Sequence, residues 1–314
     1  MADWQPAASA VHLKARADLL QDIRSYFSDQ GVLEVETPLI SKAGNTDPEI
    51  QSVRTDKGGY LRTSPEFALK RMLAAGSGDI YEMGRVFRAA EAGRHHNPEF
   101  TMLEWYRIAF DYHRLMDEVT ALVLHCGRGK FDHWPLQKLS YRELFQQYLE
   151  IDPFTADIET LASTAKHHGV HDIELDQRQW LDLLLSHFIQ PALPQSGLTF
   201  VYDFPANQAA LANIREASPR VAERFELYLG RTEVANGYQE LTDATEQKRR
   251  FEAENTQRQQ RGEQPCKIDE HLLTALTCGL PECAGVALGV DRLLMAICGA
   301  DRLEAVLAFP YSRA

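Results

Sequence analysis

The chain has 314 residues, of which 44% are hydrophobic and 25% charged, as is ordinary for a soluble globular protein with one large or two small domains. No apolar run is long enough to cross a membrane, and residues 1–16 lack the basic start and apolar core of a secretory signal. The net charge of −12 disfavours a nucleic-acid partner, because binding phosphates requires clustered lysine and arginine. The five cysteines show no paired spacing, so we expect free thiols in a cytoplasmic protein.

The first half of the chain is predicted to alternate helices with strands. Apolar residues at helical spacing predict a helix over 12–29, followed by a strand over 32–40. The sequence Ser64-Pro65-Glu66 is typical of a helix start, with Ser64 as the N-cap and Pro65 at the first helical position. Further predicted elements are strands over 81–88 and 99–110, joined by a loop over 91–98, and helices over 113–126 and 141–149.

The second half contains a mostly helical insertion around 141–196 and then further strands. Strands are expected over 198–204, 222–228, 231–240 and 284–289, with a polar helix over 244–261. The basic run of that helix, Gln247–Arg250 with Arg258 and Arg261, is interpreted as solvated. Clustered strands with intervening helices indicate an α+β fold, a largely antiparallel β-sheet flanked by helices, within a single domain over 1–314.

An acidic residue interrupts the apolar face of the strand predicted over 99–110. Phe100, Met102, Glu104 and Tyr106 share one face if the segment is extended. Burying a carboxylate is costly unless it is paired. The pattern therefore predicts a pocket that receives a cation.

Two more glutamates have a suggestive spacing. If residues 222–236 form a tight hairpin that turns at Leu229-Gly230, Glu226 and Glu233 face each other across the strands. Like charges in that position are destabilising unless a divalent cation such as Mg²⁺ bridges them. The alternative is two solvent-facing acids.

Five segments, in order, resemble the class II aminoacyl-tRNA synthetases, specifically the lysyl branch. Residues 88–107 are similar to motif 2, residues 31–41 with Pro38 to motif 1, and residues 284–295 to motif 3; residues 61–73 and 224–244 are similar to segments that bind the amino acid and the metal. The resemblance covers most of 12–314. It implies the class II catalytic fold and a homodimer formed through motif 1.

One domain of the lysyl enzymes is not expected here. Only about ten residues precede the first predicted helix, which leaves no room for an OB-fold anticodon domain. Together with the charge, this disfavours tRNA as the acceptor. The resemblance is therefore to the truncated paralogues, the elongation factor P–(R)-β-lysine ligases, which activate (R)-β-lysine with ATP and transfer it to a lysine side chain of elongation factor P.

The resemblance implies roles for the nucleotide-site residues. It places Arg88 at the α-phosphate of ATP, Arg292 near the γ-phosphate and adenine, Phe100 stacked on adenine, and His96 and Asn97 along the nucleotide. It makes Glu226 and Glu233 the Mg²⁺-binding acids, with Glu226 also at the ATP. Taken alone, Arg292 reads as a surface helix arginine and Phe100 as core.

The resemblance also implies an amino-acid pocket. Glu104 and Glu240 would receive the distal ammonium, and Ser64 or Glu66 would lie near the other amine; Tyr106, Asn236, Tyr238, Ala287 and Gly289 complete the candidates. Asn236, Tyr238 and Glu240 fall on one strand face. The small residues Gly285, Ala287 and Gly289 would let a ligand approach the backbone.

Position 287 is a candidate for substrate choice. Lysyl-tRNA synthetases carry glycine there, and the β-lysine ligases carry alanine. The extra methyl would crowd an α-amine and favour a substrate whose amine is displaced by one carbon, an effect of about 1–3 kcal/mol. The alternative is a neutral change.

One position departs from the lysyl pattern. The family has Asn-Glu after the motif 2 arginine, whereas this chain has Ala89 and Ala90, with the acid one residue later at Glu91. Glu91 or backbone groups would have to take over adenine recognition, or selectivity for ATP would be looser.

Three functions compete on the sequence. The first is the β-lysine ligase. The second is a stand-alone lysine-activating core or an aspartyl-like asparagine synthetase, and the pocket acids speak against asparagine chemistry. The third is a non-catalytic regulatory paralogue, which would not need to keep both arginines and both metal-binding acids. The first step needs no acid–base catalyst, because the carboxylate attacks already ionised, and no residue suggests itself as the base of the second.

Overall fold

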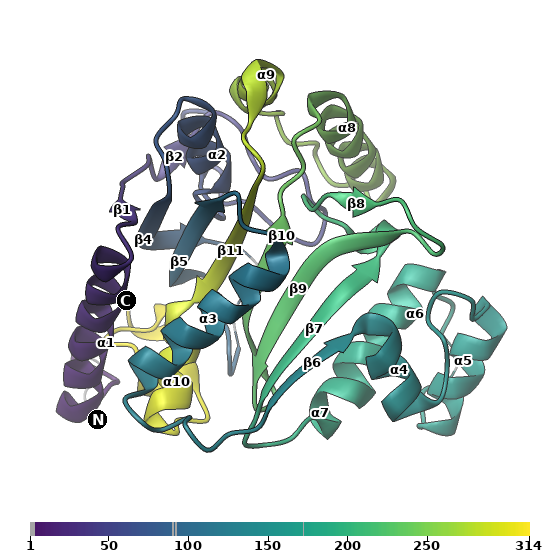
Figure 1. Cartoon of the computed structure of the whole chain (residues 1–314), viewed down its shortest axis with the longest axis horizontal. Coiled ribbons are helices and arrows are strands. Elements are labelled where there is room, and N and C mark those ends of the chain that lie inside the picture. Colours follow the sequence, from purple (N-terminus) through teal and green to yellow (C-terminus); the bar gives the residue numbers. More distant parts are fainter. Residues whose placement is uncertain (1–3, 90, 92, 172) are drawn as a thin grey trace. The chain divides into compact units, whose positions relative to one another are not determined.

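The computed structural model describes residues 4–89, 91, 93–171 and 173–314. The chain forms two compact units (Figure 1). The first unit contains the residues up to Lys130 together with Glu240–Ala314, and the second contains Phe131–Gln239.

The first unit is built on four paired strands. Their order is β1 (Leu33–Glu34), β4 (Ile80–Phe87), β5 (Glu99–Ile108) and β11 (Cys283–Gly289). β5 pairs antiparallel with β4 and with β11, and β1 pairs parallel with β4. β2 (Ile40–Ser41) and β3 (Tyr60–Leu61) form a separate antiparallel pair. β5 has a strand partner on each side, and its residues from Thr101 to Arg107, which alternate between the two faces of the sheet, are all buried.

Six α-helices belong to the described part of this unit. They are α1 (Ala10–Asp29), α2 (Glu66–Ala74), α3 (Tyr112–Gly127), α8 (Ala244–Gln260), α9 (Glu270–Gly279) and α10 (Val290–Cys298). Helix α1 packs on α3 and α10, and α9 packs on α2 and α8. Phe27 of α1 stacks on Tyr81 of β4 with ring centroids 4.4 Å apart and meets the edge of Trp105 of β5. Short 3₁₀ turns, η3 (Leu303–Ala305) and η4 (Tyr311–Arg313), complete the C-terminal segment.

The second unit contains the helical insertion and its own strands. The strand order is β10 (Thr232–Gln239), β9 (Val221–Leu229), β7 (Leu198–Pro205) and β6 (Leu136–Ser140), and β8 (Ile214–Arg215) pairs with β9. All these pairs are antiparallel except β6 with β7. Its helices are α4 (Tyr141–Leu149), α5 (Ile158–His167), α6 (Gln177–Leu184) and α7 (Gln190–Ala192), with the π-helix η1 (Leu185–Ile189) and the 3₁₀ turn η2 (Ala206–Gln208). Tyr141 stacks on Phe145 in a core that includes Trp180 and Phe204.

The strand predicted over 32–40 is wrong. Within it, strand pairing is limited to β1 at Leu33–Glu34 and the first residue of β2, Ile40. The segment between them is irregular, and Thr37 there accepts a hydrogen bond from Arg62 with its carbonyl oxygen. The alternation of apolar and polar residues that suggested a strand comes from a segment without a strand partner along most of its length.

The start of α2 differs by one residue from the prediction. The helix begins at Glu66, with Pro65 rather than Ser64 in the N-cap position. Ser64 still caps the helix in chemical terms, because its hydroxyl accepts a hydrogen bond from the Glu66 N–H at 2.9 Å. This places the Ser64 hydroxyl and the Glu66 side chain side by side.

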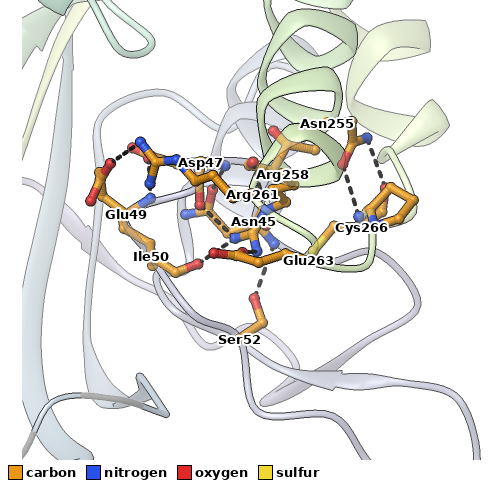
Figure 2. Close-up of polar contacts among 12 residues, drawn as sticks. Asn45, Asp47, Glu49, Ile50, Ser52, Asn255, Arg258, Arg261, Glu263 and Cys266 are labelled. Carbon is orange, nitrogen blue, oxygen red and sulfur yellow. Dashed lines mark hydrogen bonds and ion pairs between the residues drawn. The ribbon is translucent and has the colours of Figure 1, made fainter. Parts of the chain in front are cut away.

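Helix α8 is not simply solvated, contrary to the sequence interpretation. Gln247, Arg250 and Arg258 are buried, and Arg258 is only 3% exposed. As Figure 2 shows, Arg258 points into the loop over 45–52, where it donates to the carbonyl oxygens of Thr46 at 2.9 Å, Asp47 at 2.5 Å and Ile50 at 2.7 Å. Its charge is paired with Glu263 at 2.8 Å. One side of α8 therefore holds a loop, while most of its other polar residues face water.

Candidate functional site

Three glutamates, two of them buried and one partly exposed, meet in the first unit. They are Glu66 at the start of α2, Glu104 in the middle of β5 and Glu240 just after β10. Each acts electrostatically on the others, and Glu104 and Glu240 are 2% and 4% exposed. The sequence predicted all three as pocket residues, and the structure brings them together.

Glu104 is held by hydroxyl groups. Tyr106 donates from its phenol to Oε1 at 2.7 Å, and Ser64 donates to Oε2 at 2.6 Å. Burial and the neighbouring charge of Glu66 raise the pKa of Glu104 to about 8, although the two hydrogen bonds oppose that shift. Burial and Glu104 also raise the pKa of Tyr106 well above its usual value. Near neutral pH, therefore, Glu104 holds a proton that a bound cation could replace.

A lysine that the sequence analysis missed lies beside the other two acids. The ammonium nitrogen of Lys70 is 2.7 Å from Glu66 Oε1 and 2.6 Å from Glu240 Oε2, and its side chain is 1% exposed. Burial lowers the pKa of Lys70, but the attraction of Glu240 and Glu66 outweighs this and raises it overall. The one sequence feature that points to Lys70 is its spacing of four residues from Glu66. Such pairs are common on exposed helix surfaces, so the spacing does not predict a buried lysine.

A fourth acid near Glu104 is already neutralised. Glu82 lies directly opposite Glu104 across β4 and β5. Its carboxylate accepts from Arg62 at 2.5 Å and from Thr37 at 2.7 Å, and the ion pair with Arg62 is almost fully buried. Two carboxyl groups can therefore lie opposite each other here, because the charge of Glu82 is paired with Arg62.

Strand β11 supplies the small residues beside this cluster. A Cβ added at Gly285 would come within 2.4 Å of Glu240 Oε1 and of the Tyr106 ring, so Gly285 makes room for protein side chains. This differs from the expectation that the small residue admits a ligand. Ala287 pairs with Glu104 and Gly289 with Met102 in the β5–β11 register. The Ala287 methyl therefore shares a sheet face with the Glu104 carboxylate.

A cavity of about 400 Å³ opens beside α2. Its lining includes Pro38, Ser64, Glu66 and Asp269. The Glu66 side chain is 15% exposed, against 1% for Glu240. Glu66 is thus the more accessible of these two acids.

The predicted nucleotide residues form a second group in the first unit. The Arg88 guanidinium lies 5.2 Å from the ring centroid of Phe100 and 3.1 Å from Glu91 Oε1. Arg292, in the first turn of α10, donates to His96 Nε2 at 2.8 Å. Burial and the charge of Arg292 lower the pKa of His96, so its ring stays neutral and accepts this bond. Arg88 with Phe100 and Arg292 with His96 are therefore two preformed pairs.

The loop that carries His96 is fixed to the C-terminal segment. Asn97 donates from its side-chain amide to the Glu99 carbonyl oxygen at 2.6 Å and accepts from the Tyr311 N–H at 2.9 Å. Arg94 pairs with Asp301 at 2.8 Å. Asn97, predicted to line the nucleotide, thus also connects two chain segments. Ala90, one of the two departures from the lysyl pattern, lies outside the described residues.

Helix α10 is anchored at its first turn by Asp291. This buried carboxylate accepts from Arg16 of α1 and from the backbone N–H of Thr101 on β5, the latter at 2.7 Å. An acid in the first turn also interacts favourably with the helix dipole. Asp291 therefore sets the position from which Arg292 extends.

In the second unit, the hairpin register differs from the prediction. The turn lies at Gly230-Arg231, because Thr232 pairs with Leu229, and a bulge separates Glu233 from Ala235. Glu233 is opposite Tyr228 and Glu226 is opposite Asn236, so the two acids do not face each other directly. Both nevertheless act on Arg224 and Tyr228, which places them diagonally on one face.

Arg224 organises that face. It pairs with Glu226, donates to Asn236 Oδ1 at 3.3 Å and lies 4.4 Å from the Phe204 ring centroid. Glu226 also accepts from the Tyr228 hydroxyl at 2.6 Å. Tyr238 pairs with Arg224 in the register and packs against the core of this unit. The sequence analysis missed Arg224, which lies beside Glu223 in a strand that is otherwise mostly apolar.

Over the described ranges, no group of three or more His, Cys, Asp or Glu side chains could hold a metal ion by itself. Likewise, none of the helices in the described ranges is long and apolar enough to span a membrane.

Comparison with models of known protein families shows the family of this chain. The model described as tRNA synthetases class II (D, K and N) matches residues 2–313. The chain belongs to this class II tRNA synthetase family.

Several members of the family are similar to the chain over nearly their whole length. The chain is 50% identical to the elongation factor P–(R)-β-lysine ligase of Vibrio cholerae serotype O1, with 99% of each chain covered. It is 49% identical to the ligase of the same name from Proteus mirabilis and 47% identical to that of Yersinia enterocolitica, covering 100% of this chain and 99% of each relative.

Membership of the class II family confirms the resemblance and the predicted fold class. The strands of both units pair mostly antiparallel and helices flank them, as the α+β prediction required. The roles of individual residues stay predictions, which the geometry above makes specific.

Proposed function

We propose that this chain is an ATP-dependent ligase that activates (R)-β-lysine as its adenylate and transfers it to a lysine side chain of elongation factor P. The relatives that carry this name match the chain at 47–50% identity over almost their entire length. The observation that carries the proposal is the buried carboxylate of Glu104, whose hydrogen-bond partners in the described structure are two neutral hydroxyls. A buried carboxylate without a cation is costly, and a substrate ammonium would remove that cost.

The acid cluster fits a diamino acid. We assign Glu104 and Glu240 to one ammonium and Glu66 with Ser64 to the other, while Tyr106 keeps Glu104 oriented. Ala287 lies beside Glu104, where its methyl group limits the position of the substrate amine. Leaving these acids unpaired when a neutral amino acid binds would give strong discrimination.

Arginines supply the charge needed for adenylation. The carboxylate oxygen of the substrate attacks the α-phosphorus of ATP, the bond to pyrophosphate breaks, and pyrophosphate leaves with the electron pair. We assign Arg88 to the α-phosphate and Arg292 to the terminal phosphates, with Phe100 under the adenine and His96 and Asn97 along the nucleotide. Fixed guanidinium groups stabilise charge on the phosphates without reorganisation.

The second step forms the new amide bond. A neutral lysine amine of elongation factor P attacks the carbonyl carbon of the adenylate, AMP leaves, and the amine loses a proton. The described residues suggest no base for this proton.

Glu226 and Glu233 are the proposed Mg²⁺ ligands. Two carboxylates on one face of a hairpin fit the preference of Mg²⁺ for a few protein oxygens completed by phosphates and water. Glu226 is already paired with Arg224 and accepts from the Tyr228 hydroxyl, so its carboxylate is oriented before a metal binds. When bound, the ion would neutralise phosphate charge.

Two further features of the proposal follow from the family. The chain is expected to form a homodimer through the segment around Pro38. It is also expected to use a protein rather than tRNA as its acceptor.

Amino-acid-dependent exchange between ATP and pyrophosphate tests the proposed function. The assay would compare (R)-β-lysine, α-lysine, aspartate and no amino acid in the presence of Mg²⁺. We expect (R)-β-lysine to support the fastest exchange. Preference for α-lysine would indicate a stand-alone lysine-activating core, and no exchange by folded protein would indicate a non-catalytic paralogue.

A further inference from the structure

The pocket acids have an internal cation, and the charge balance of the cluster depends on it. Glu66, Glu104 and Glu240 are three carboxylates, whereas Lys70 is the ammonium that touches two of them. When all four groups are ionised, the cluster carries two negative charges in excess. A diamino acid brings two ammonium groups, so it neutralises this excess.

The position of Lys70 is more specific than an ordinary helix ion pair requires. Its Nζ lies 2.7 Å from Glu66 and 2.6 Å from Glu240, and both its side chain and that of Glu240 are 1% exposed. Exposed pairs at this helix spacing contribute little. A buried one, by contrast, controls whether its partners are charged.

We propose that Lys70 is a positioning residue, a resident cation that favours the ionised form of Glu240 and holds Glu240 and Glu66 aligned so that they can receive a substrate ammonium. This proposal deepens the proposed function and rests on it. Lys70 itself contacts the two acids and is not required to touch the substrate.

The other titratable groups around the pair do not replace Lys70. Glu104 and Tyr106 on β5 and Cys283 on β11 are the further groups that face these acids. Burial and Glu240 raise the pKa of Cys283 to about 12, and the pKa of Tyr106 is also raised, so both stay neutral. Glu82 on β4 has its charge paired with Arg62. Among the described residues that face Glu240, Lys70 is therefore the cation in contact with it.

Removing the charge should change how binding depends on pH. Burial raises the pKa of Glu240 to about 7, although the charge of Lys70 opposes that shift. In Lys70→Met this opposing charge is lost, so the pKa of Glu240 rises further and the carboxyl stays protonated above neutral pH. Substrate binding must then release that proton as well as the one on Glu104. Each pH unit below the new pKa of Glu240 weakens binding about tenfold.

Exchange assays with (R)-β-lysine between about pH 7 and 9 would measure this effect. We expect Lys70→Met to raise KM by about tenfold or more at pH 7, with recovery at higher pH and little change in kcat. Lys70→Arg keeps the charge, so its KM should depend on pH in the same way as that of the unmodified protein. Poorer packing of the larger side chain would change KM equally at every pH. A loss of equal size at every pH, or no loss, would overturn the proposal.

A stability measurement gives a second test that needs no substrate. The double variant Glu66→Gln/Lys70→Met has the same net charge in the cluster as the unmodified protein. Its melting temperature should therefore recover most of what Lys70→Met loses, even if Lys70→Met alone fails to fold. If the double variant instead loses the sum of what Glu66→Gln and Lys70→Met lose separately, a role of Lys70 in charge balance is contradicted.

The two tests separate the inference from the proposed function. If the unmodified protein activates no amino acid, the proposed function fails, yet the stability cycle still reports on Lys70. If the protein is active but the losses of melting temperature in the two single variants add up in the double variant, the inference about Lys70 fails while the proposed function stands.

Discussion

At the scale of single residues, the substrate preference depends on one methyl group. Ala287 is the cross-strand partner of Glu104, so its side chain lies on the face that carries the acid. A methyl group changes discrimination by about 1–3 kcal/mol in a close-packed pocket. We therefore expect Ala287 to affect the choice between α-lysine and (R)-β-lysine, whose amines differ in position by one carbon, without affecting the adenylation step.

Replacing Ala287 with glycine tests this role. We expect the ratio of kcat/KM for α-lysine to that for (R)-β-lysine to rise about tenfold or more. Ala284→Gly is the matched control, because it makes the same change in the same strand but pairs with Arg107, three residues away and on the opposite face. Similar ratios in the two variants would show that the effect belongs to the backbone and not to the pocket.

Residue-level sequence reasoning worked where a residue conflicts with its local pattern. Glu104 was found because a carboxylate on an apolar strand face requires an explanation. Lys70 was missed and Arg258 was wrongly interpreted as solvated, because each lies in a helix where a charge is ordinary. Only the fold shows that each points inward. Burial of a charge in a helix has no local sequence signature unless the surrounding pattern is apolar.

At the scale of elements, helix α8 holds a loop that touches both parts of the candidate site. Arg258 fixes the loop over 45–52 through three short bonds to its carbonyl oxygens (Figure 2). Within that loop, Asn45 donates to the Thr63 hydroxyl at 3.2 Å, next to Ser64. The Gln51 carbonyl accepts from the Ala89 N–H at 2.8 Å, next to Arg88. The helix thus supports the amine pocket and the arginine through one segment.

Arg258→Met should destabilise the protein by about 3 kcal/mol or more, because it leaves buried carbonyl groups and Glu263 without their partner. Arg261→Ala is a suitable control. Arg261, at the C-cap of the same helix, pairs with Glu49 at 2.7 Å. Both side chains are well exposed, so the loss of this pair should cost at most about 1 kcal/mol. Chemical denaturation measures both values, and equal losses would contradict the assignment of Arg258 as the anchor.

The elements themselves were predicted unevenly, for physical reasons. Long periodic segments such as α1, β5 and α3 match the predicted ranges closely. The strand over 32–40 was wrong because pairing, not pattern, makes a strand, and β4 pairs only with Leu33 and Glu34 there. The predicted register of the β9–β10 hairpin was wrong because the turn lies one residue later than expected, at Gly230-Arg231. A bulge between Glu233 and Ala235, which has no clear sequence signal, shifts the pairing further.

At the scale of the whole molecule, the buried acids should make stability depend on pH. Burial and Glu66 raise the pKa of Glu104 to about 8, against about 4.3 in an unfolded chain. Between these values the folded state binds more protons than the unfolded state, so the free energy of unfolding falls as pH rises. Glu246 acts in the opposite direction and in a different range. Hydrogen bonds from arginine lower its pKa to about 2, so the stability it contributes is lost only in strong acid.

The free protein should therefore lose melting temperature as pH rises from about 6 to 8, with at most about 1.4 kcal/mol of stability lost per pH unit for each group that titrates. Because (R)-β-lysine binds the ionised carboxylate, the stabilisation it gives should grow over the same range. Glu104→Gln stays neutral at every pH, so its melting temperature should fall less steeply, and the slope that remains belongs to Glu240, whose pKa burial also raises. Thermal unfolding of both proteins, with and without (R)-β-lysine, measures these slopes. Parallel curves for the two proteins would show that Glu104 is ionised before substrate binds, and that the amine pocket does not exchange a proton for its ligand.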